Sequence, residues 1–371
     1  MKVLVVHADL RAKGGAESYA DAVISRLKSA GHTVGILDIT GHRSGTDEIS
    51  NPSLFKFGRA LLLNRFTLWK YALVCRILPK VATEYGYVIF SFGEGPNLSR
   101  PTLQLRHAPA IFSGNPELLA VLGVRKPTIL LRQIYAWGCR KVARMQPQVS
   151  GPARTVTNTH WTASMARTHC NIENPYILYP KVNRDLIRHA TTPRNPYHMV
   201  CIGRIVPNKR LEDAIAVLER LNKRGLPATL QIIGRADGAY ANRFIKKYKN
   251  HPGLIISPNA DKAILSEALA QARLGLHGFR SEHFGIAVAE MICSGVLPLV
   301  HNSGGVCELV QNPELRFETV DDLTEKALHF MQIPQEEYQQ TSDRLKHTDA
   351  LQRALNFDAL LDAIITREIT A

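Results

Sequence analysis

Several features common in proteins are missing from this chain of 371 residues, and each absence excludes a class of protein. No Cys-x-x-Cys pair occurs, and the six cysteines form no Cys/His cluster at zinc-ligand spacing, which argues against a zinc finger or a redox dithiol. No run of about 18 apolar residues is present to span a bilayer as a helix. We therefore predict a cytoplasmic protein, attached at most peripherally to the inner face of a membrane.

Acidic residues are scarce in the first half of the chain. Residues 1–183 hold 23 Lys and Arg against 10 Asp and Glu, whereas the remainder holds 23 against 22. Residues 49–83 and 118–172 contain no acidic residue. This imbalance indicates an anionic partner for the first half: a membrane surface, a phosphate-bearing acceptor or nucleic acid. No nucleic-acid-binding motif accompanies the charge, so we expect no specific nucleic-acid partner.

The stretch from Leu54 to Lys80 mixes aromatic and aliphatic residues with six Lys and Arg. A basic-aromatic surface of this kind can lie in the headgroup layer of an anionic membrane. The alternative is a pair of core-packed helices whose Lys and Arg side chains are solvated.

What is present is a repeated alternation of strands and helices. Apolar, strand-like segments occur at residues 3–7, 33–39, 87–92, 103–106 and 154–158, and again at 198–202, 229–233, 254–257, 272–277 and 296–300. The pattern predicts two doubly wound α/β domains. We place the first at 1–183 and the second at 184–350. A last helix within 351–371 has no strand after it, and we expect it to cross back to the first domain.

The stretch from Gly278 to Gly295 predicts a strand end, a loop and a buried helix, and it carries two glutamates with seven residues between them. The N–H groups of Phe284 and Gly285, at the start of the helix, suit a phosphate or a sugar. One carboxylate accepts two hydroxyl donors. We therefore expect Glu290 to hold a ribose and Glu282 to hold a hexose.

Two cations follow one strand of the second half, Arg204 and Lys209. They can converge on a diphosphate, the Arg as a fork and the Lys as a compact charge; the alternative is a surface ion pair. No Asp-x-Asp occurs, so a divalent cation has no obvious ligand pair. We expect no metal and no cofactor, with the diphosphate charge neutralised by these side chains and by helix dipoles.

Two features of the first half are also candidates for ligand-binding residues. Gly14 and Gly15 let the backbone approach a ligand, but they lack the G-x-G-x-x-G spacing of a nicotinamide site, and an ordinary turn is the alternative. His107 follows a strand, where ligands of open α/β sheets bind. A structural histidine is the alternative there.

Taken together, these motifs resemble the family 4 retaining glycosyltransferases of the GT-B fold. The resemblance rests on Gly14-Gly15-Ala16-Glu17, Gly203-Arg204 with Lys209, Gly234-Arg235, Glu282 to Glu290, and Asn302-Ser303-Gly304-Gly305. Four stretches look more narrowly like the branch that contains the α-1,2-mannosyltransferase of lipid-linked oligosaccharide synthesis: Glu282–Ile286, His301–Gly305, Arg106–Pro109 and Leu178–Pro180. The two glutamates with seven residues between them are the most specific part.

The resemblance implies two Rossmann-like domains facing a cleft, with the acceptor bound mainly by the N-terminal domain and the nucleotide sugar by the C-terminal one. By position, it assigns Arg204 and Lys209 to the diphosphate, Glu290 to the ribose, Glu282 with the backbone of His283, Phe284 and Gly285 to the hexose, His107 to the sugar near the reacting carbon, and Gly14, Gly15, Gly234 and Arg235 to the donor site.

The implied activity is that of a retaining hexosyltransferase, which moves mannose from GDP-mannose to a lipid-linked or polymeric glycan at the cytoplasmic membrane surface. In this family the nucleotide diphosphate leaves from the front face and takes the acceptor proton. Val306-Cys307-Glu308 stands where Pro and Asp are common in relatives, which leaves acceptor and donor base open. The alternatives are a UDP-sugar-dependent transferase of polysaccharide or secondary-metabolite assembly, a sugar-nucleotide 2-epimerase and a basic nucleic-acid-binding protein.

Overall fold

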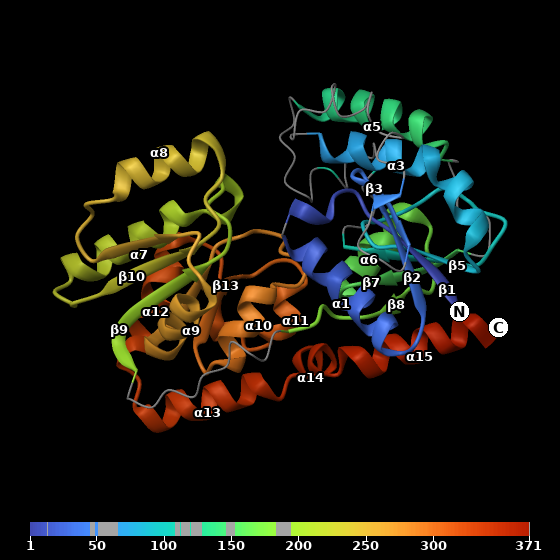
Figure 1. Ribbon diagram of the computed structural model, residues 1–371. Coiled ribbons are helices and arrows are strands. Elements are labelled where there is room, and N and C mark those ends of the chain that lie inside the picture. The colour runs from blue at the N-terminus through green and yellow to red at the C-terminus, as the bar shows by residue number, and fades with distance from the viewer. Residues whose placement is uncertain are drawn as a thin grey trace. The chain divides into compact units, whose positions relative to one another are not determined.

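The computed structural model describes residues 1–12, 14–44, 49–50, 66–107, 112, 119, 128–145, 153–182 and 194–370. The chain forms two compact units (Figure 1). Unit 1 contains Met1–Lys181 and Asn356–Ala371, and unit 2 contains Val182–Leu355. The single helix expected near the C-terminus is divided: α14 (Asp349–Leu355) belongs to unit 2 and α15 (Phe357–Thr370) belongs to unit 1.

Unit 1 is built on a sheet with the strand order β4-β3-β2-β1-β5-β6-β7-β8. Its strands are Lys2–Val6 (β1), Thr33–Asp38 (β2), Gly41–Ser44 (β3), Ile49–Ser50 (β4), Tyr87–Phe90 (β5), Thr102–Arg106 (β6), Ala153–Thr157 (β7) and Tyr176–Ile177 (β8). The sheet is parallel from β2 to β8, and β3 and β4 add an antiparallel edge. The strand order reverses between β1 and β5, whose carboxyl ends therefore mark a ligand position typical of such sheets.

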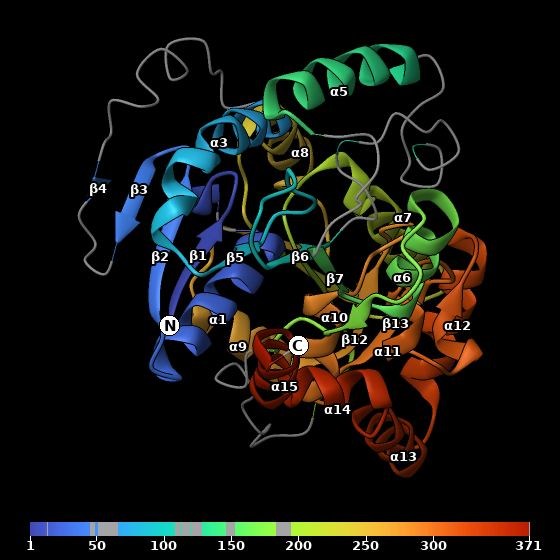
Figure 2. The ribbon, with the colours of Figure 1, turned by 90° about the vertical axis from the view of Figure 1, so that its right-hand side faces the viewer.

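The two faces of this sheet carry separate cores, because successive side chains of a strand point to opposite sides. Leu4 and Val6 of β1 pack on the side of α3 and α5, whereas Val3 and Val5 pack on the side of α1 and α15. The helices of unit 1 besides α15 are α1 (Gly15–Ser29), α3 (Thr67–Val81), α5 (Ile129–Ala143) and α6 (His160–Cys170), with 3-10 turns at Leu10–Ala12 and Ala82–Glu84. Figures 1 and 2 both place α5 on the outer side of α3.

The basic-aromatic stretch Leu54–Lys80 is described from residue 66 onward, and residues 54–65 lie outside the described residues. In α3 most apolar side chains are buried in the core, including Tyr71, and Trp69, Leu73 and Ile77 pack against it while partly buried. Lys70 is buried too, with its Nζ 3.0 Å from Oδ2 of Asp9. From Thr67 onward, this stretch therefore follows the core-packed alternative, whereas Phe66, just before α3, is exposed. Among the described helices, none is both long and apolar enough to cross a membrane.

Unit 2 is built on a parallel sheet with the order β11-β10-β9-β12-β13-β14. Its strands are Asn195–Ile202 (β9), Thr229–Gly234 (β10), Leu254–Pro258 (β11), Ala272–His277 (β12), Leu297–His301 (β13) and Arg316–Phe317 (β14). Its helices besides α14 are α7 (Leu211–Lys223), α8 (Gly238–Tyr248), α9 (Lys262–Gln271), α10 (Ile286–Cys293), α11 (Val306–Leu309), α12 (Val320–Gln332) and α13 (Gln335–Lys346), with 3-10 turns at Pro207–Lys209 and Pro313–Leu315. Here the strand order reverses between β9 and β12.

Candidate functional site

The two strands at the reversal point of unit 2 end beside each other, and each is followed by a predicted site segment. Gly203 follows β9 and Gly278 follows β12. The loops after these strands pack closely: a Cβ on Gly278 would lie 3.3 Å from the carbonyl oxygen of Lys209. Since ligands of doubly wound sheets bind beyond the carboxyl ends of strands at such a point, the sheet places the predicted diphosphate and hexose residues where a nucleotide sugar would bind.

Lys209 and Glu282, predicted to act on different parts of a donor, are in direct contact. The Lys209 Nζ lies 2.9 Å from Oε2 of Glu282, and the same oxygen accepts a hydrogen bond of 3.1 Å from Nε2 of His277. Burial alone raises the pKa of Glu282, but the hydrogen bond from His277 and the charge of Lys209 outweigh it and hold the pKa well below its usual range. Glu282 is therefore a fixed, ionised acceptor.

His277 is a site residue that the sequence did not identify. It ends the apolar strand β12, is almost fully buried, and has a lowered pKa because of burial and the nearby charge of Lys209. The neutral imidazole donates its Nε2–H to Glu282, which fixes the carboxylate from the side of the sheet. The sequence position of His277 is a weak indication of a site residue, since a histidine at the end of a buried strand is more often part of a core.

The backbone of Glu282 is held by the Gly304–Gly305 motif. Gly305 donates its N–H to the carbonyl of Glu282 over 2.7 Å, and Ser281 donates its N–H to Oγ of Ser303 over 2.8 Å. Gly304 has φ of 85°, and a Cβ there would lie 2.3 Å from the carbonyl oxygen of Glu282, so only glycine fits. The motif thus supports the position of the carboxylate from the backbone side.

Arg204 is exposed and has no hydrogen-bond or ion-pair partner in the described part of the chain, so its guanidinium is available to an anion. Gly234 has a packing role: a Cβ there would lie 1.8 Å from the carbonyl oxygen of Gly203. The carbonyl of Arg235 accepts a hydrogen bond of 2.8 Å from Ile205, and its side chain pairs with Asp237. The Gly234-Arg235 pair therefore braces the loop that carries Arg204.

Glu290 lies in α10 and is mostly buried without a cation. Within the described residues its carboxyl group makes no hydrogen bond or ion pair, and burial raises its pKa to about 7. A buried carboxyl group without a partner is costly in the free protein. Such a group is suited to accept hydroxyl donors from a ligand.

The segment before α10 has the shape that the sequence predicted. Phe284 buries its ring, and Gly285, with φ of 90°, is the N-cap of the helix. His283 donates its N–H to Oε1 of Glu282 over 3.1 Å, and burial lowers the pKa of its imidazole. The helix start and Glu282 are therefore one connected structure.

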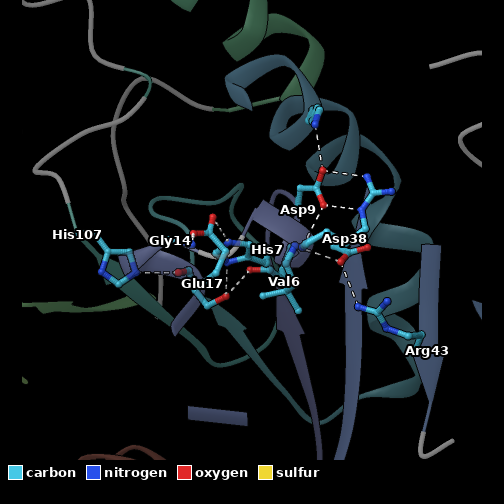
Figure 3. Close-up of polar contacts among 12 residues, drawn as sticks. Val6, His7, Asp9, Gly14, Glu17, Asp38, Arg43 and His107 are labelled. Carbon is cyan, nitrogen blue, oxygen red and sulfur yellow. Dashed lines mark hydrogen bonds and ion pairs between the residues drawn. The ribbon is translucent and has the colours of Figure 1, made fainter. Parts of the chain in front are cut away.

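In unit 1 the reversal point carries His107, Gly14 and a network that joins them to the core (Figure 3). His107 donates its Nε2–H to the carbonyl of Ser91 over 2.9 Å, and its ring packs edge-on against Tyr19 at 4.8 Å between centroids. Ser91 directly follows β5, and its Oγ is 2.9 Å from Nδ1 of His7 at the end of β1. His107 is thus anchored at the strand ends.

The Gly14-Gly15 turn is held by a side chain that the sequence left without a role. Glu17 accepts the N–H of Gly14 over 2.7 Å, and its other oxygen is 3.5 Å from Nε2 of His7 (Figure 3). Burial raises the pKa of Glu17, but the hydrogen bond from His7 and backbone donors lower it on balance. The available signal was the spacing of a carboxylate three residues after the start of a helix, which is the pattern of a capping box.

A second polar group lies beside this network at the ends of β1 and β2 (Figure 3). Asp9 accepts hydrogen bonds from Arg11 at 2.8 Å and from Lys70 at 3.0 Å, and Asp38 accepts one from Arg43 at 3.1 Å. Burial raises the pKa of Asp9, but the hydrogen bonds and charges of Arg11 and Lys70 lower it to about 2. In the described ranges, no group of three or more His, Cys, Asp and Glu side chains is placed to hold a metal ion.

Residues 183–347 match the family model described as Glycosyl transferases group 1. This part of the chain is similar to the group 1 glycosyl transferases. The matched segment contains Arg204, Lys209, Glu282 and Glu290, so the cluster built around β9 and β12 lies inside the family region.

Two curated relatives carry the same name, GDP-Man:Man(3)GlcNAc(2)-PP-Dol alpha-1,2-mannosyltransferase. The protein from Caenorhabditis elegans is 26% identical over 202 residues, which cover 50% of this chain and 40% of that relative. The protein from Xenopus tropicalis is 38% identical over 145 residues, which cover 37% of this chain and 28% of that relative. The matches span less than half the length of these relatives.

Among solved structures, sucrose-phosphate synthase from Thermosynechococcus elongatus superposes with a TM-score of 0.68 at 13% identity, over 100% of this chain and 99% of that chain. A likeness at this identity shows the fold, which is GT-B with two Rossmann-like units. The predicted family, its branch and the fold class are confirmed.

Proposed function

We propose that this glycosyltransferase is a retaining hexosyltransferase, which moves mannose from GDP-mannose to a lipid-linked or polymeric glycan at the cytoplasmic face of a membrane. The name shared by the two curated relatives supports the donor and the lipid-linked acceptor. The observation that carries the proposal is the set of groups at the β9–β12 reversal point. An ionised carboxylate, an unpartnered arginine and an uncompensated buried carboxyl group lie there on adjoining segments.

Each group has a role that its surroundings suit. Arg204 and Lys209 bind the donor diphosphate, and Lys209 stays electrostatically coupled to Glu282 while it does so. Glu282 accepts hexose hydroxyls, and the ribose hydroxyls supply Glu290 with the donors it lacks. The backbone at His283, Phe284 and Gly285 adds contacts at the start of α10.

The chemistry then needs little from the protein beyond position and charge. The nucleotide diphosphate leaves from the face that the acceptor approaches, and its departing oxygen takes the acceptor proton. Arg204 and Lys209 stabilise the negative charge that grows on the diphosphate, which removes the need for a metal ion. His107, fixed through the carbonyl of Ser91, contacts the sugar near the reacting carbon. Unit 1 supplies the acceptor site and unit 2 the donor site.

Thermal-shift screening against GDP-mannose, UDP-glucose and ADP-glucose tests the donor. A ligand that binds only the native state at about 100 times its Kd adds about 2.7 kcal/mol of stability, so GDP-mannose should raise the Tm by several degrees. Arg204→Ala and Lys209→Ala should lose this rise. Lys262→Ala removes an exposed cation elsewhere on unit 2 and should keep it.

Transfer assays test the reaction itself. The product should keep the anomeric configuration of the donor, as read by NMR, and Glu290→Ala should abolish turnover while the protein stays folded. Normal turnover in both Glu290→Ala and Lys209→Ala would remove the site assignment. A larger thermal shift with UDP-glucose would favour a UDP-sugar-dependent transferase. An epimerised nucleotide sugar formed without any acceptor would favour a 2-epimerase.

A further inference from the structure

Five of the eight large apolar side chains that are exposed in the described ranges lie on α5 and at the start of α3. Their exposed fractions are 45% for Phe66, 66% for Leu130, 69% for Leu131, 58% for Ile134 and 57% for Trp137. Isolated exposed apolar residues are ordinary on protein surfaces, but a contiguous group on one helix marks a binding surface.

The group forms one face of the helix. Leu130, Ile134, Trp137 and Lys141 recur at spacings of four, three and four residues, which brings them onto the same side at 3.6 residues per turn. Leu131 widens this side. The outward face is therefore apolar over its first turns and basic at its end.

The opposite face of α5 is already occupied. Ala136, Cys139 and Ala143 are buried in the core beneath it. The Tyr135 hydroxyl accepts the backbone N–H of Trp69 in α3 over 3.0 Å, so the two helices are tied together. The apolar outward face consequently cannot reach the core of unit 1 by rotation of the helix, and both ribbon views show α5 as the outermost helix there (Figures 1 and 2).

The charged residues of α5 and of the sequence on either side of it have one sign. No acidic residue occurs between 118 and 172, whereas Lys141 and Arg144 are exposed in the last turn of α5 and just after it. The Lys141 Nζ lies 5.9 Å from the centre of the Trp137 ring, so the cation adjoins the apolar group. Apolar side chains beside cations and without any carboxylate complement a surface that is apolar inside and anionic at its headgroups.

We propose that the outward face of α5, together with Phe66, docks on an anionic lipid bilayer. The boundary between headgroups and acyl chains receives the apolar side chains of Leu130, Leu131, Ile134 and Trp137. The lipid phosphates pair with Lys141 and Arg144. The helix lies in the plane of the interface and does not cross it. This inference rests on the proposed function only in that it names the surface that brings unit 1 to a lipid-linked acceptor.

Co-sedimentation of the full chain with vesicles tests the docking. The protein should bind vesicles that contain phosphatidylglycerol and bind pure phosphatidylcholine more weakly, with salt reducing the difference. Ile134→Asp with Trp137→Asp should weaken binding by more than about tenfold. Ile255→Asp with Ile264→Asp, which changes two exposed apolar residues of unit 2, should leave it unchanged.

The basic end is tested in the same way. Lys141→Glu with Arg144→Glu should weaken binding to anionic vesicles by about tenfold or more. The reason is that the two cations together contribute about this factor to the affinity for a charged membrane. Lys246→Glu with Lys262→Glu makes the same change of net charge on unit 2. This variant should bind vesicles as the parent protein does, apart from a small loss of affinity caused by the lower net charge. Equal losses of vesicle affinity in the two double variants would overturn the proposal, because net charge alone would then explain the binding.

Trp137 gives a direct readout. In a Trp69→Phe, Trp161→Phe variant its fluorescence should shift to the blue on anionic vesicles and should be quenched by brominated acyl chains. No shift, or retention on DNA in place of vesicles at physiological salt, would overturn the proposal. Loss of a dimer in the α5 variants, seen by light scattering, would assign the face to a second copy of this chain instead.

The thermal shift with GDP-mannose separates this inference from the proposed function. The α5 variants should keep that shift and the parent melting temperature, because no donor residue lies in α5. Vesicle binding without any nucleotide response would refute the proposed function alone. Nucleotide binding with vesicle binding unaffected by the α5 changes would refute the docking surface alone.

Discussion

At the scale of single residues, Glu290 and Glu282 show how burial acts on a carboxyl group with and without partners. Glu282 has His277 and Lys209, and its pKa falls although it is buried. Glu290 has no partner within the described residues, and its pKa rises to about 7. One site therefore contains an acceptor that is always charged at neutral pH and another that is poised between its two forms.

This contrast predicts a pH dependence of stability for Glu290. Its pKa is about 7 in the folded state and near the ordinary value of 4.5 in the unfolded chain, so the folded state binds more protons between these values. The unfolding free energy should therefore fall as pH rises from about 4.5 to about 7. Glu290→Gln should remove this fall and stabilise unit 2 at pH 8 by at most about 3 kcal/mol.

Thermal melting of the parent protein and of Glu290→Gln between pH 5 and pH 8 measures the effect. The matched control is Glu337→Gln on α13, where the carboxylate is exposed and the two melting curves should stay parallel. A difference between parent and Glu290→Gln that does not change with pH would show that the buried group is not protonated near neutrality.

At the scale of elements, the loop from β12 to α10 depends on a close approach of two backbones. Gly304 and Gly225 both have positive φ, 85° and 83°, but a Cβ on Gly304 would meet the backbone of Glu282 whereas one on Gly225 would meet nothing within 4 Å. Gly304→Ala and Gly225→Ala share the conformational strain of about 1 kcal/mol. Only Gly304→Ala should also displace Glu282 and weaken GDP-mannose binding in calorimetry, by about tenfold or more. Similar GDP affinities in the two variants would contradict the bracing role.

The elements also show what the sequence could predict. Strand β12 has the predicted bounds, 272–277, because this largely apolar segment is buried along its whole length. The lipid-facing alternative for Leu54–Lys80 was not confirmed in its described part. Both α3 and α5 combine apolar residues with cations, and periodicity alone does not tell which of two such helices lies inside and which outside.

The site was predicted in its residues and not in its contacts. Glu282, Lys209 and Glu290 were identified from spacing and resemblance, and their chemical roles stay predictions. The Lys209–Glu282 pair joins residues 73 positions apart, and such pairing depends on the strand order of the sheet, which local patterns do not contain. The contact of His7 with Ser91, 84 positions away, could not be predicted for the same reason. Glu17 differs, because its capping-box spacing is a local signal.

At the scale of the whole molecule, α15 completes the core of unit 1. Phe357 and Leu361 are fully buried against β1, β5 and α1, and Arg26 pairs with the exposed side of α15 at Asp362. Leu361→Ala should destabilise unit 1 by about 2–5 kcal/mol through the cavity it leaves. Asp362→Ala removes a part-exposed, solvent-screened ion pair and should cost much less stability than Leu361→Ala.

Hydrogen exchange followed by mass spectrometry assigns this effect to a unit. In Leu361→Ala the amides of β1 and β5 should exchange faster, while those of β9 and β12 keep their protection. Faster exchange confined to unit 2, or the same loss of protection in Asp362→Ala, would show that α15 does not contribute to unit 1 in the way its buried side chains indicate.

The division of unit 1 into two segments has a consequence for the growing chain on the ribosome. Residues 182–355 are all synthesised before Phe357 and Leu361, so unit 2 has its full set of strands and helices while unit 1 still lacks part of its core. Domains generally fold as units during synthesis. Translation therefore leaves the face of β1 and β5 that carries Val3, Val5 and Ile89 incompletely covered until α15 emerges, which makes unit 1 the part of the nascent protein most in need of a chaperone.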